Sequence, residues 1–382
     1  MKPQRKAGPR TSALGAAAVC GALVLTACGS GGGAGSSHSP SAPASSPSAT
    51  GAAGIACGKA ATLHASGSTA QQYAMKYWIT TYTTACPGTK ITYDGNGSGA
   101  GQDDFLSGRT AFAGSDSPLD ADQVTRSEKV CSGGGRAIHL PLVGGPIALA
   151  FHLPGVDRLV LDGPTLAKIF DGRITRWNDP AIARLNKDAN LPSTPIRTFH
   201  RSDSSGTTDN FTAYLAAAGQ GAWPYPHAKE WPAHGGDAAK GSADLAAQVQ
   251  RTTGALGYVE LPYAVDRMLR TISVDTGAPA PADPNVTSAS HAIAGATTVN
   301  TGHDVTLRLD YGTKVPGAYP IDVVTYEIVC DKGNKPETWP ATKAFLAYTA
   351  SRKGQQNLSF QGYATLPAAV VDKVRGEIGA LP

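Results

Sequence analysis

One stretch, residues 195–208, says most about the fold; it reads PIRTFHRSDSSGTT. Pro195–Phe199 is typical of a strand, and a run of hydroxyl and glycine residues follows it. The next segment carries Phe211, Tyr214, Leu215 and Ala218 at helical spacing. A strand that ends in small polar residues directly before a helix is typical of α/β proteins, which bind ligands at that edge of the sheet.

The same pattern recurs earlier in the chain. Expected strands at 61–65, 90–93 and 110–114 end in Ser66-Gly67-Ser68-Thr69, in Gly95–Gly101 and in Ser115-Asp116. Helices are expected at 70–84, at 101–107 and after Ser117, where Ser117 is the predicted N-cap, Pro118 the first helical residue and Asp120 the capping-box acid. The alternation predicts an α/β fold with mostly parallel sheets.

The rest of the chain continues in this style. The apolar residues 138–151 predict two strands broken at Gly144-Gly145-Pro146, and further strands are expected at 257–259 and 323–329. Residues 276–303 are rich in Pro, Ala, Ser and Thr, which favours an irregular surface segment. Helices are expected at 338–351 and 368–378.

Composition bounds the class of protein. The 382 residues are 41% hydrophobic and 16% charged, a length that favours two domains. The formal charge of +4 comes from Lys2, Arg5, Lys6 and Arg10, because the remaining chain holds 29 basic and 29 acidic residues. A neutral chain without a basic run argues against nucleic-acid binding.

The first 56 residues are predicted to be a signal peptide followed by a flexible tether. Residues 1–27 have a basic start and an apolar segment too short to span a bilayer, as in a signal peptide. Leu25-Thr26-Ala27-Cys28 resembles a bacterial lipobox, in which Cys28 would be acylated and would anchor the protein to the membrane; the alternative is an ordinary secretory signal with an incidental cysteine. Residues 28–56 are Gly, Ser, Ala and Pro-rich, which predicts a flexible tether.

Four cysteines remain, Cys57, Cys86, Cys131 and Cys330. An even number in an exported chain favours two disulfides, for which three pairings exist; the alternative is four free buried cysteines. No Cys/His spacing predicts a zinc site, and no cofactor is expected.

The strand ends supply candidate anion ligands. Thr69, Ser98 and Ser205-Gly206-Thr207 would offer hydroxyl and backbone donors at helix N-termini, with Arg201 nearby. Each alone is explained by an N-cap, whereas together they favour an oxyanion site. Two enzymatic patterns are weak: Gly95-x-Gly97-x-x-Ala100 matches a dinucleotide fingerprint loosely, and His200 near Ser205 lacks a third triad member.

At these motifs the sequence resembles the phosphate-binding proteins of bacterial phosphate ABC transporters. The segments that carry the resemblance are Gly67-Ser68-Thr69, Tyr93–Gly99, Phe112–Leu119 and His200–Thr207, supported by Leu161–Leu166, Ile174–Pro180, Gly254–Glu260 and Tyr363–Pro367. It spans roughly residues 60–375. One departure is Ala70, where the family usually has an aromatic residue.

The resemblance implies a two-lobed periplasmic-binding-type fold (type II) with its ligand in the cleft between the lobes. Residues 57–143 plus 320–382 would form lobe I and residues 144–319 lobe II. By matching motif positions, the phosphate ligands would be Thr69, Ser98, Asp116, Arg201, Ser205, Gly206 and Thr207. Asp116 would accept a hydrogen bond from a phosphate O–H, and Asp203 could orient Arg201.

Further expectations follow from this resemblance. The protein would be a monomer and not an enzyme, held outside the cell membrane by lipid on Cys28, and would pass phosphate to membrane permease subunits served by a cytoplasmic ATPase. An exported phosphatase, or a binder of sulfate or molybdate, is the alternative. In the α/β arrangement, Cys57 and Cys86 would share one sheet edge and Cys330 would end an antiparallel strand, which predicts the disulfides Cys57–Cys86 and Cys131–Cys330.

Overall fold

The first part of the described chain alternates strands and helices. A computed structural model describes residues 54–382. Strands β1 (Thr62–Gly67), β2 (Lys90–Asp94) and β3 (Phe112–Ser115) pair in parallel. Helices α1 (Gln72–Ala85) and α2 (Ser98–Leu106) connect them, and α3 (Ala121–Ser127) follows. Helix α1 buries Ala74, Trp78 and Tyr82 at the spacing of one helical face, which explains why it packs on the sheet.

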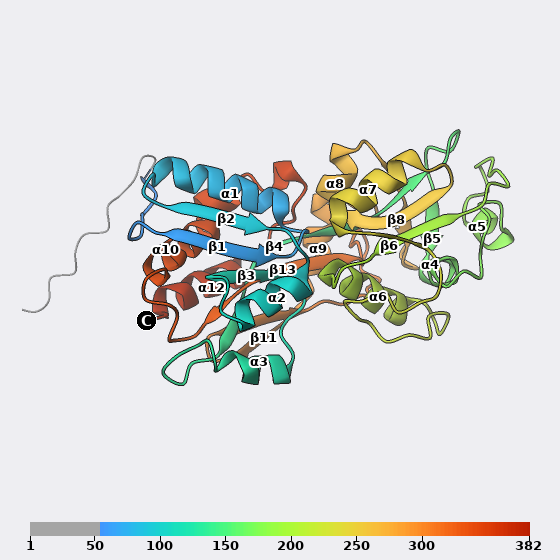
Figure 1. Cartoon of the computed structure of the whole chain (residues 1–382). Coiled ribbons are helices and arrows are strands. Elements are labelled where there is room, and N and C mark those ends of the chain that lie inside the picture. Colours follow the sequence, from blue (N-terminus) through green and yellow to red (C-terminus); the bar gives the residue numbers. More distant parts are fainter. Residues whose placement is uncertain (1–53) are drawn as a thin grey trace, which may run out of the picture. The chain divides into compact units, whose positions relative to one another are not determined.

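A long strand joins this first strand set to a second one (Figure 1). Strand β4 (Ala137–His152) pairs antiparallel with β13 (Asp322–Cys330) as far as Pro146 and with β8 (Ala255–Glu260) from Ile147 onward. Nearly every residue of β4 is buried, as its apolar sequence predicts. The prediction of two strands is wrong, because Gly144-Gly145-Pro146 lie where the pairing partner changes, without ending the strand.

The second strand set is also parallel. Strand β6 (Arg197–Arg201) pairs in parallel with β8 and with β7 (Asp237–Ala239), while β9 (Arg270–Thr271) pairs with β4. The full order is β2-β1-β3-β13-β4-β8-β6-β7. Helices α6 (Gly206–Ala218), α7 (Gly241–Arg251) and α8 (Leu261–Asp266) accompany these strands. The other elements of this part are β5 (Val160–Asp162), α4 (Gly163–Phe170), α5 (Pro180–Leu185) and β10 (Ser273–Asp275).

The register of β4 brings the carboxyl ends of both strand sets together. Glu260, the last residue of β8, lies opposite Ile147. Ser115, the last residue of β3, lies opposite Tyr326, which in turn lies opposite Pro141. Because the two parallel sets run in opposite directions along β4, their ligand-binding edges meet near its middle.

Two large cores support the two strand sets. The first core surrounds Leu63, Trp78 and Phe112, and the second surrounds Leu149, Trp177 and Phe211. Ile55, expected at the end of the tether, is buried in the first core. The lobe boundaries at 143/144 and 319/320 remain a proposal, which β4 and β13 support.

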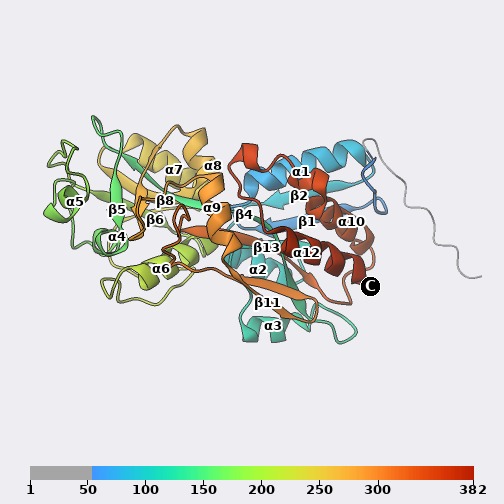
Figure 2. The ribbon, with the colours of Figure 1, turned by 180° about the vertical axis from the view of Figure 1, so that it is seen from behind.

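Residues 276–303 are more ordered than their composition suggested. They contain α9 (Val286–Ala294), which begins with a capping box at Asn285, and β11 (Thr297–Thr301), which pairs with β12 (Asp304–Arg308). Figure 2 shows α9 beside β13 and β4. Ala289, Ile293 and Leu307 lie in the first core, which favours assigning these elements to lobe I, whereas the proposed boundaries place them in lobe II.

Helix α3 begins later than predicted. Its N-cap is Asp120, whose carboxylate accepts a hydrogen bond from the Gln123 N–H at 2.8 Å and completes a capping box with Gln123. The predicted N-cap, Ser117, instead donates its hydroxyl to Asp209 Oδ2 of α6 at 2.5 Å. A contact with the other strand set therefore determines what this serine does.

The C-terminal elements close the first core. They are α10 (Trp339–Ala350), α11 (Arg352–Gln355), a short 3-10 helix η2 (Ser359–Gln361) and α12 (Ala368–Ala380). Phe345, Val374 and Ile378 pack in that core. Within residues 54–382 no helix is both long and apolar enough to cross a membrane. The predicted signal peptide, Cys28 and most of the tether lie outside the described residues.

Both predicted disulfides are present. Cys57 bonds to Cys86, with Cα atoms 5.6 Å apart, and Cys131 bonds to Cys330, with Cα atoms 5.4 Å apart. The second bridge joins the segment after α3 to the end of β13. The antiparallel course of β13, which the pairing assumed, is also confirmed.

Candidate functional site

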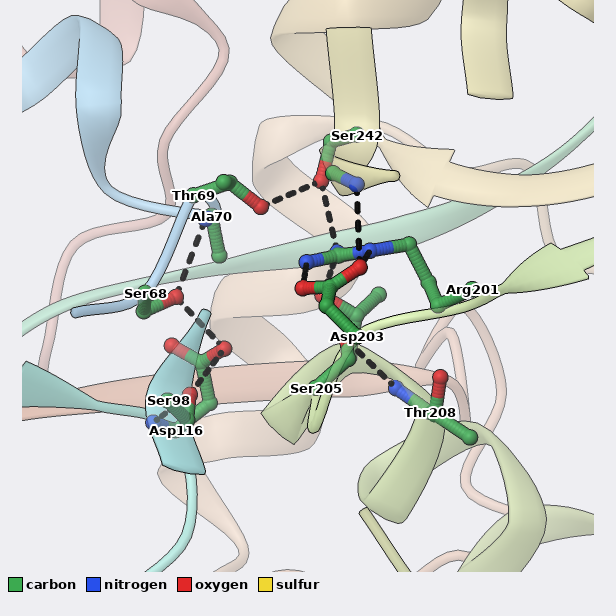
Figure 3. A network of polar contacts seen from close by, with 12 residues as sticks. Ser68, Thr69, Ala70, Ser98, Asp116, Arg201, Asp203, Ser205, Thr208 and Ser242 are labelled. Carbon is green, nitrogen blue, oxygen red and sulfur yellow. Dashed lines mark hydrogen bonds and ion pairs between the residues drawn. The ribbon is translucent and has the colours of Figure 1, made fainter. Parts of the chain in front are cut away.

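The polar strand ends of the two sets face each other near the middle of β4 (Figure 3). Ser68 and Thr69 follow β1, Ser98 begins α2 and Asp116 follows β3. From the second set, Arg201 ends β6, Ser205 caps α6 and Ser242 lies in the first turn of α7. Each of these side chains is buried. The site is thus assembled from turns that join strands to helices, as the sequence pattern predicts.

Asp116 is the acceptor at the centre of the first side. Its Oδ2 accepts hydrogen bonds from Ser68 Oγ at 2.6 Å and from Ser98 Oγ at 3.3 Å, and its Oδ1 accepts one from Thr325 Oγ1 at 2.7 Å. The pKa of Asp116 is raised to about 6, mainly by burial. The charge of Glu260 also raises this pKa, whereas the hydrogen bonds from Ser68 and Thr325 lower it. The group is therefore mainly ionised at pH 7.

Arg201 is the cation of the second side. Its Nε donates to Asp203 Oδ1 at 2.8 Å, and its Nη2 donates to the other oxygen of the same carboxylate. Burial alone would raise the pKa of Asp203. The hydrogen bonds and the charge of Arg201 outweigh this effect, so the net shift of the pKa is downward. The expectation that Asp203 orients Arg201 thus agrees with this two-point contact.

The outer nitrogen of Arg201 faces the hydroxyl groups. Its Nη1 donates to Ser242 Oγ at 3.0 Å and to Thr207 Oγ1 at 3.3 Å. Thr207 Oγ1 donates to Glu260 Oε1, and Ser242 Oγ is hydrogen-bonded to Thr69 Oγ1 at 2.8 Å. The last contact joins the first side of the site directly to the second.

Several further contacts hold the two sides together. Asn210 Nδ2 of α6 donates to the Asp116 carbonyl at 3.0 Å, and Tyr263 Oη of α8 donates to the Thr69 carbonyl at 2.7 Å. The Gly99 N–H donates to the Ser204 carbonyl at 3.0 Å. The structure therefore shows the two strand sets in direct contact across the site.

Glycine makes this contact possible. A Cβ on Gly206 would lie 2.6 Å from both Asp116 Cβ and Ser98 Oγ, and one on Gly99 would lie 2.0 Å from Ser204 Oγ. At Gly97, where φ is +102°, a Cβ would lie 2.6 Å from Asp203 Oδ2. Gly97, which belongs to the loose dinucleotide fingerprint, thus serves the close approach of two chain segments.

The structure gathers all seven predicted ligand residues at the facing strand ends, where Asp116 and Arg201 each centre a hydrogen-bonded group. Ser98 contacts Asp116, Gly206 lies against both, and Thr207 and Ser242 link Arg201 toward Thr69. The side chain of Ser205 caps α6, because its Oγ accepts a hydrogen bond from the Thr208 N–H at 3.2 Å. Ala70, the departure from the family pattern, donates its N–H to Ser68 Oγ at 2.9 Å.

Sequence reasoning missed four polar groups of this network. Ser68 and Glu260 stand inside segments that carry the resemblance but were given no role, and Thr325 lies within a strand that reads as apolar. Ser242 follows Gly241 after the short strand β7, so the strand-end rule applied to that segment could have found it. His200 is not part of the network; its ring stacks on Trp231 at 5.1 Å between centroids.

Comparison with known proteins agrees with this architecture. A family model described as a PBP superfamily domain matches residues 41–353. The chain is 41% identical over 369 residues to the phosphate-binding protein PstS 3 of Mycobacterium tuberculosis, a match that covers 94% of this chain and 96% of that protein.

Two solved structures share the fold. One is a high-affinity periplasmic phosphate-binding protein bound with phosphate, which matches with a TM-score of 0.66 and 21% identity over 83% of this chain and 93% of the other. Another is a putative phosphate ABC transporter substrate-binding protein with bound phosphate from Clostridium perfringens, with a TM-score of 0.58 and 18% identity over 80% of this chain and 100% of the other.

The fold is therefore that of the periplasmic-binding-type substrate-binding proteins, and the two-lobed α/β architecture that the sequence predicted is confirmed. Within that class, the chain belongs to the family of PstS phosphate-binding proteins.

Proposed function

We propose that this protein binds inorganic phosphate with high affinity outside the cytoplasmic membrane and delivers it to an ABC permease for import. The observation that carries the proposal is that a buried cation, Arg201, and a buried acceptor, Asp116, stand on facing sides of one site, each hydrogen-bonded to hydroxyl groups. Family membership supports the same function.

The ligand set proposed is Thr69, Ser98, Asp116, Arg201, Ser205, Gly206 and Thr207. Arg201 would attract the anion, and hydroxyl and backbone N–H donors at the starts of α2 and α6 would complete its shell. Phosphate at neutral pH keeps at least one O–H, and Asp116 would accept a hydrogen bond from it. Sulfate has no proton at that pH, so the same carboxylate would repel it and confer selectivity.

Capture would proceed by closure of the two lobes. The contacts between Thr69 and Ser242, between Asn210 and Asp116 and between Gly99 and Ser204 would hold the closed form. A permease that recognises this form would receive only loaded protein. Lipid on Cys28 would keep a monomeric protein at the outer face of the membrane, next to permease subunits driven by a cytoplasmic ATPase.

Isothermal titration with phosphate, sulfate and arsenate tests the proposal. We expect tight phosphate binding with a stoichiometry of one and much weaker sulfate binding. Tight binding of sulfate or molybdate without phosphate would favour the alternative oxyanion binder. Release of phosphate from a phosphate ester by the same preparation would favour the phosphatase and contradict a function limited to binding.

A further inference from the structure

The buried charges around the site do not balance. Within residues 54–382, Arg201 is the only arginine or lysine that is buried, whereas Asp116, Glu260 and Glu327 are buried carboxyl groups in this region. Asp203 already matches the charge of Arg201 through two hydrogen bonds. Uptake of an anion with every one of these carboxyl groups ionised is strongly disfavoured, because uncompensated charges in a protein interior are costly.

Glu327 of β13 lies near Asp116, on the same face of the sheet. It stands opposite Gly114 of β3 and two residues from Thr325, whose hydroxyl donates to Asp116. A Cβ on Gly114 would lie 1.9 Å from Gln71 Nε2 and 2.6 Å from Tyr93 Oη, so these two groups occupy the space beside Glu327. Neither carboxyl oxygen of Glu327 makes a hydrogen bond of good geometry.

Neutral groups connect Glu327 to the anion site. Gln71 Nε2 donates to Tyr93 Oη at 3.1 Å, and Tyr93 Oη donates to the Ser68 carbonyl at 2.8 Å. Ser68 Oγ donates in turn to Asp116. The groups from Gln71 to Ser68 carry no positive charge that could stabilise an ionised Glu327.

The electrostatic surroundings agree. Burial raises the pKa of Glu327 to about 8; the Gln71 amide lowers it and the charge of Asp116 raises it. The titratable groups that face this region are Tyr93 of β2, Asp116 after β3 and Tyr263 of α8, with Arg201 and Glu260 acting on Asp116 from the second side. A phosphate anion beside Asp116 would add negative charge to the same region.

We infer that Glu327 carries a proton whenever phosphate is bound, so that phosphate binding is linked to a proton held outside the ligand shell. The inference rests on the proposed function. When Glu327 is ionised in the free protein, its carboxylate takes one proton from solvent as phosphate enters, and no other reactant is required. When Glu327 is already protonated, binding needs no uptake at this residue. Affinity should therefore fall as the pH rises above the pKa of Glu327.

The test compares phosphate dissociation constants at pH 6.5 and pH 9 for the wild type and for Glu327→Gln. Phosphate itself titrates in this range, but its contribution is common to both proteins and cancels in the comparison. From pH 6.5 to pH 9, we expect affinity to weaken about tenfold more in the wild type than in the variant. The same weakening in both proteins would overturn the inference and leave the proposed function intact.

Proton uptake provides a readout that a merely structural role would not change. Titrations at pH 8.5 in two buffers with different protonation enthalpies should show more proton uptake for the wild type than for Glu327→Gln. Equal uptake would contradict the inference. Glu327→Met, neutral and of similar length, carries the same expectation if the glutamine variant does not fold.

Asp322→Asn is the matched control. Asp322 is another buried carboxyl group on β13 whose pKa burial raises well above its usual value, but its partner in the register is Pro146, away from Gly114. This variant should keep the pH dependence of the wild type. Loss of the dependence in both variants would contradict a specific role for Glu327. Failure of the wild type to bind phosphate would overturn the proposed function as well.

Discussion

The side of the site that carries Asp116 differs from the side that carries Arg201 in how each holds its charge. Asp116 is surrounded by hydroxyl donors, and burial raises its pKa. Arg201 is bound at two points by a carboxylate whose pKa is lowered. The second side therefore keeps a permanent cation, while the first holds a carboxylate whose ionisation is costly. We conclude that attraction would come from one side and selection from the other.

Of the variants that test this difference between the two sides, replacement of Arg201 should change phosphate affinity most. Arg201→Lys keeps a positive charge but loses the planar fork that contacts Asp203, Ser242 and Thr207. We expect phosphate affinity to fall at least about a hundredfold, or about 3 kcal/mol, as measured by isothermal titration.

Arg197→Lys is the matched control. It lies on the same strand but is exposed and pairs with Asp237 at the surface. This variant should bind phosphate as the wild type does. Equal losses in the two variants would indicate a general effect of changing β6 and would remove Arg201 from its proposed role.

Asp116→Asn tests selection on the other side. An amide can turn its N–H₂ toward a sulfate oxygen or its carbonyl toward a phosphate O–H. The preference for phosphate over sulfate should therefore narrow by about 1–3 kcal/mol, the usual cost of an unsatisfied buried polar group. A competition titration at fixed ionic strength measures this ratio, with Asp120→Asn as control because asparagine is an equally good N-cap for α3. An unchanged ratio in Asp116→Asn would show that Asp116 is not the selector.

Gly99→Ala tests whether phosphate binding needs the close contact between the two sides of the site. Gly99 lies in the first turn of α2, where alanine suits the helix, but its Cβ would lie 2.0 Å from Ser204 Oγ and 2.5 Å from Ser204 Cβ. The variant should fold normally and populate the closed form less, which would weaken phosphate binding by about tenfold. Gly376→Ala in α12, where a Cβ would meet no atom within 4 Å, should leave binding unchanged. Wild-type affinity in Gly99→Ala would contradict a closed form held by this contact.

The pH dependence of selectivity should give the smallest effect. Asp116 has a pKa of about 6, so it gains a proton as the pH falls below that value and can then donate to a sulfate oxygen. In the wild type, sulfate should compete better at pH 5 than at pH 7, whereas in Asp116→Asn the ratio should change little. Competition titrations at the two pH values measure this. A wild-type ratio that is constant with pH would place the selecting group elsewhere.

Local sequence rules predicted most of the proposed ligand set because these residues follow strands directly. Ser98, Ser205 and Gly206 stand at helix starts, where spacing alone indicates free N–H groups. Ser117 was misread as an N-cap because its partner, Asp209, comes from a distant segment. Tertiary contacts of this kind leave no mark on local spacing.

Buried acids were harder to find. Glu327 lies in the middle of β13, where every residue is buried and the pattern reads as an apolar strand. Glu260 ends β8, and its role depends on the distant Thr207. Helix α9 was missed because its two buried apolar residues, Ala289 and Ile293, are only one helical turn apart in a segment rich in Pro, Ala, Ser and Thr.

A crystal structure of the protein grown with phosphate tests the central claim most directly. The account predicts one tetrahedral anion between the two strand sets, with an oxygen within hydrogen-bond distance of the Asp116 carboxylate and another within hydrogen-bond distance of the Arg201 guanidinium. Phosphate bound by Arg201 without contact to Asp116, or bound outside this network, would contradict it.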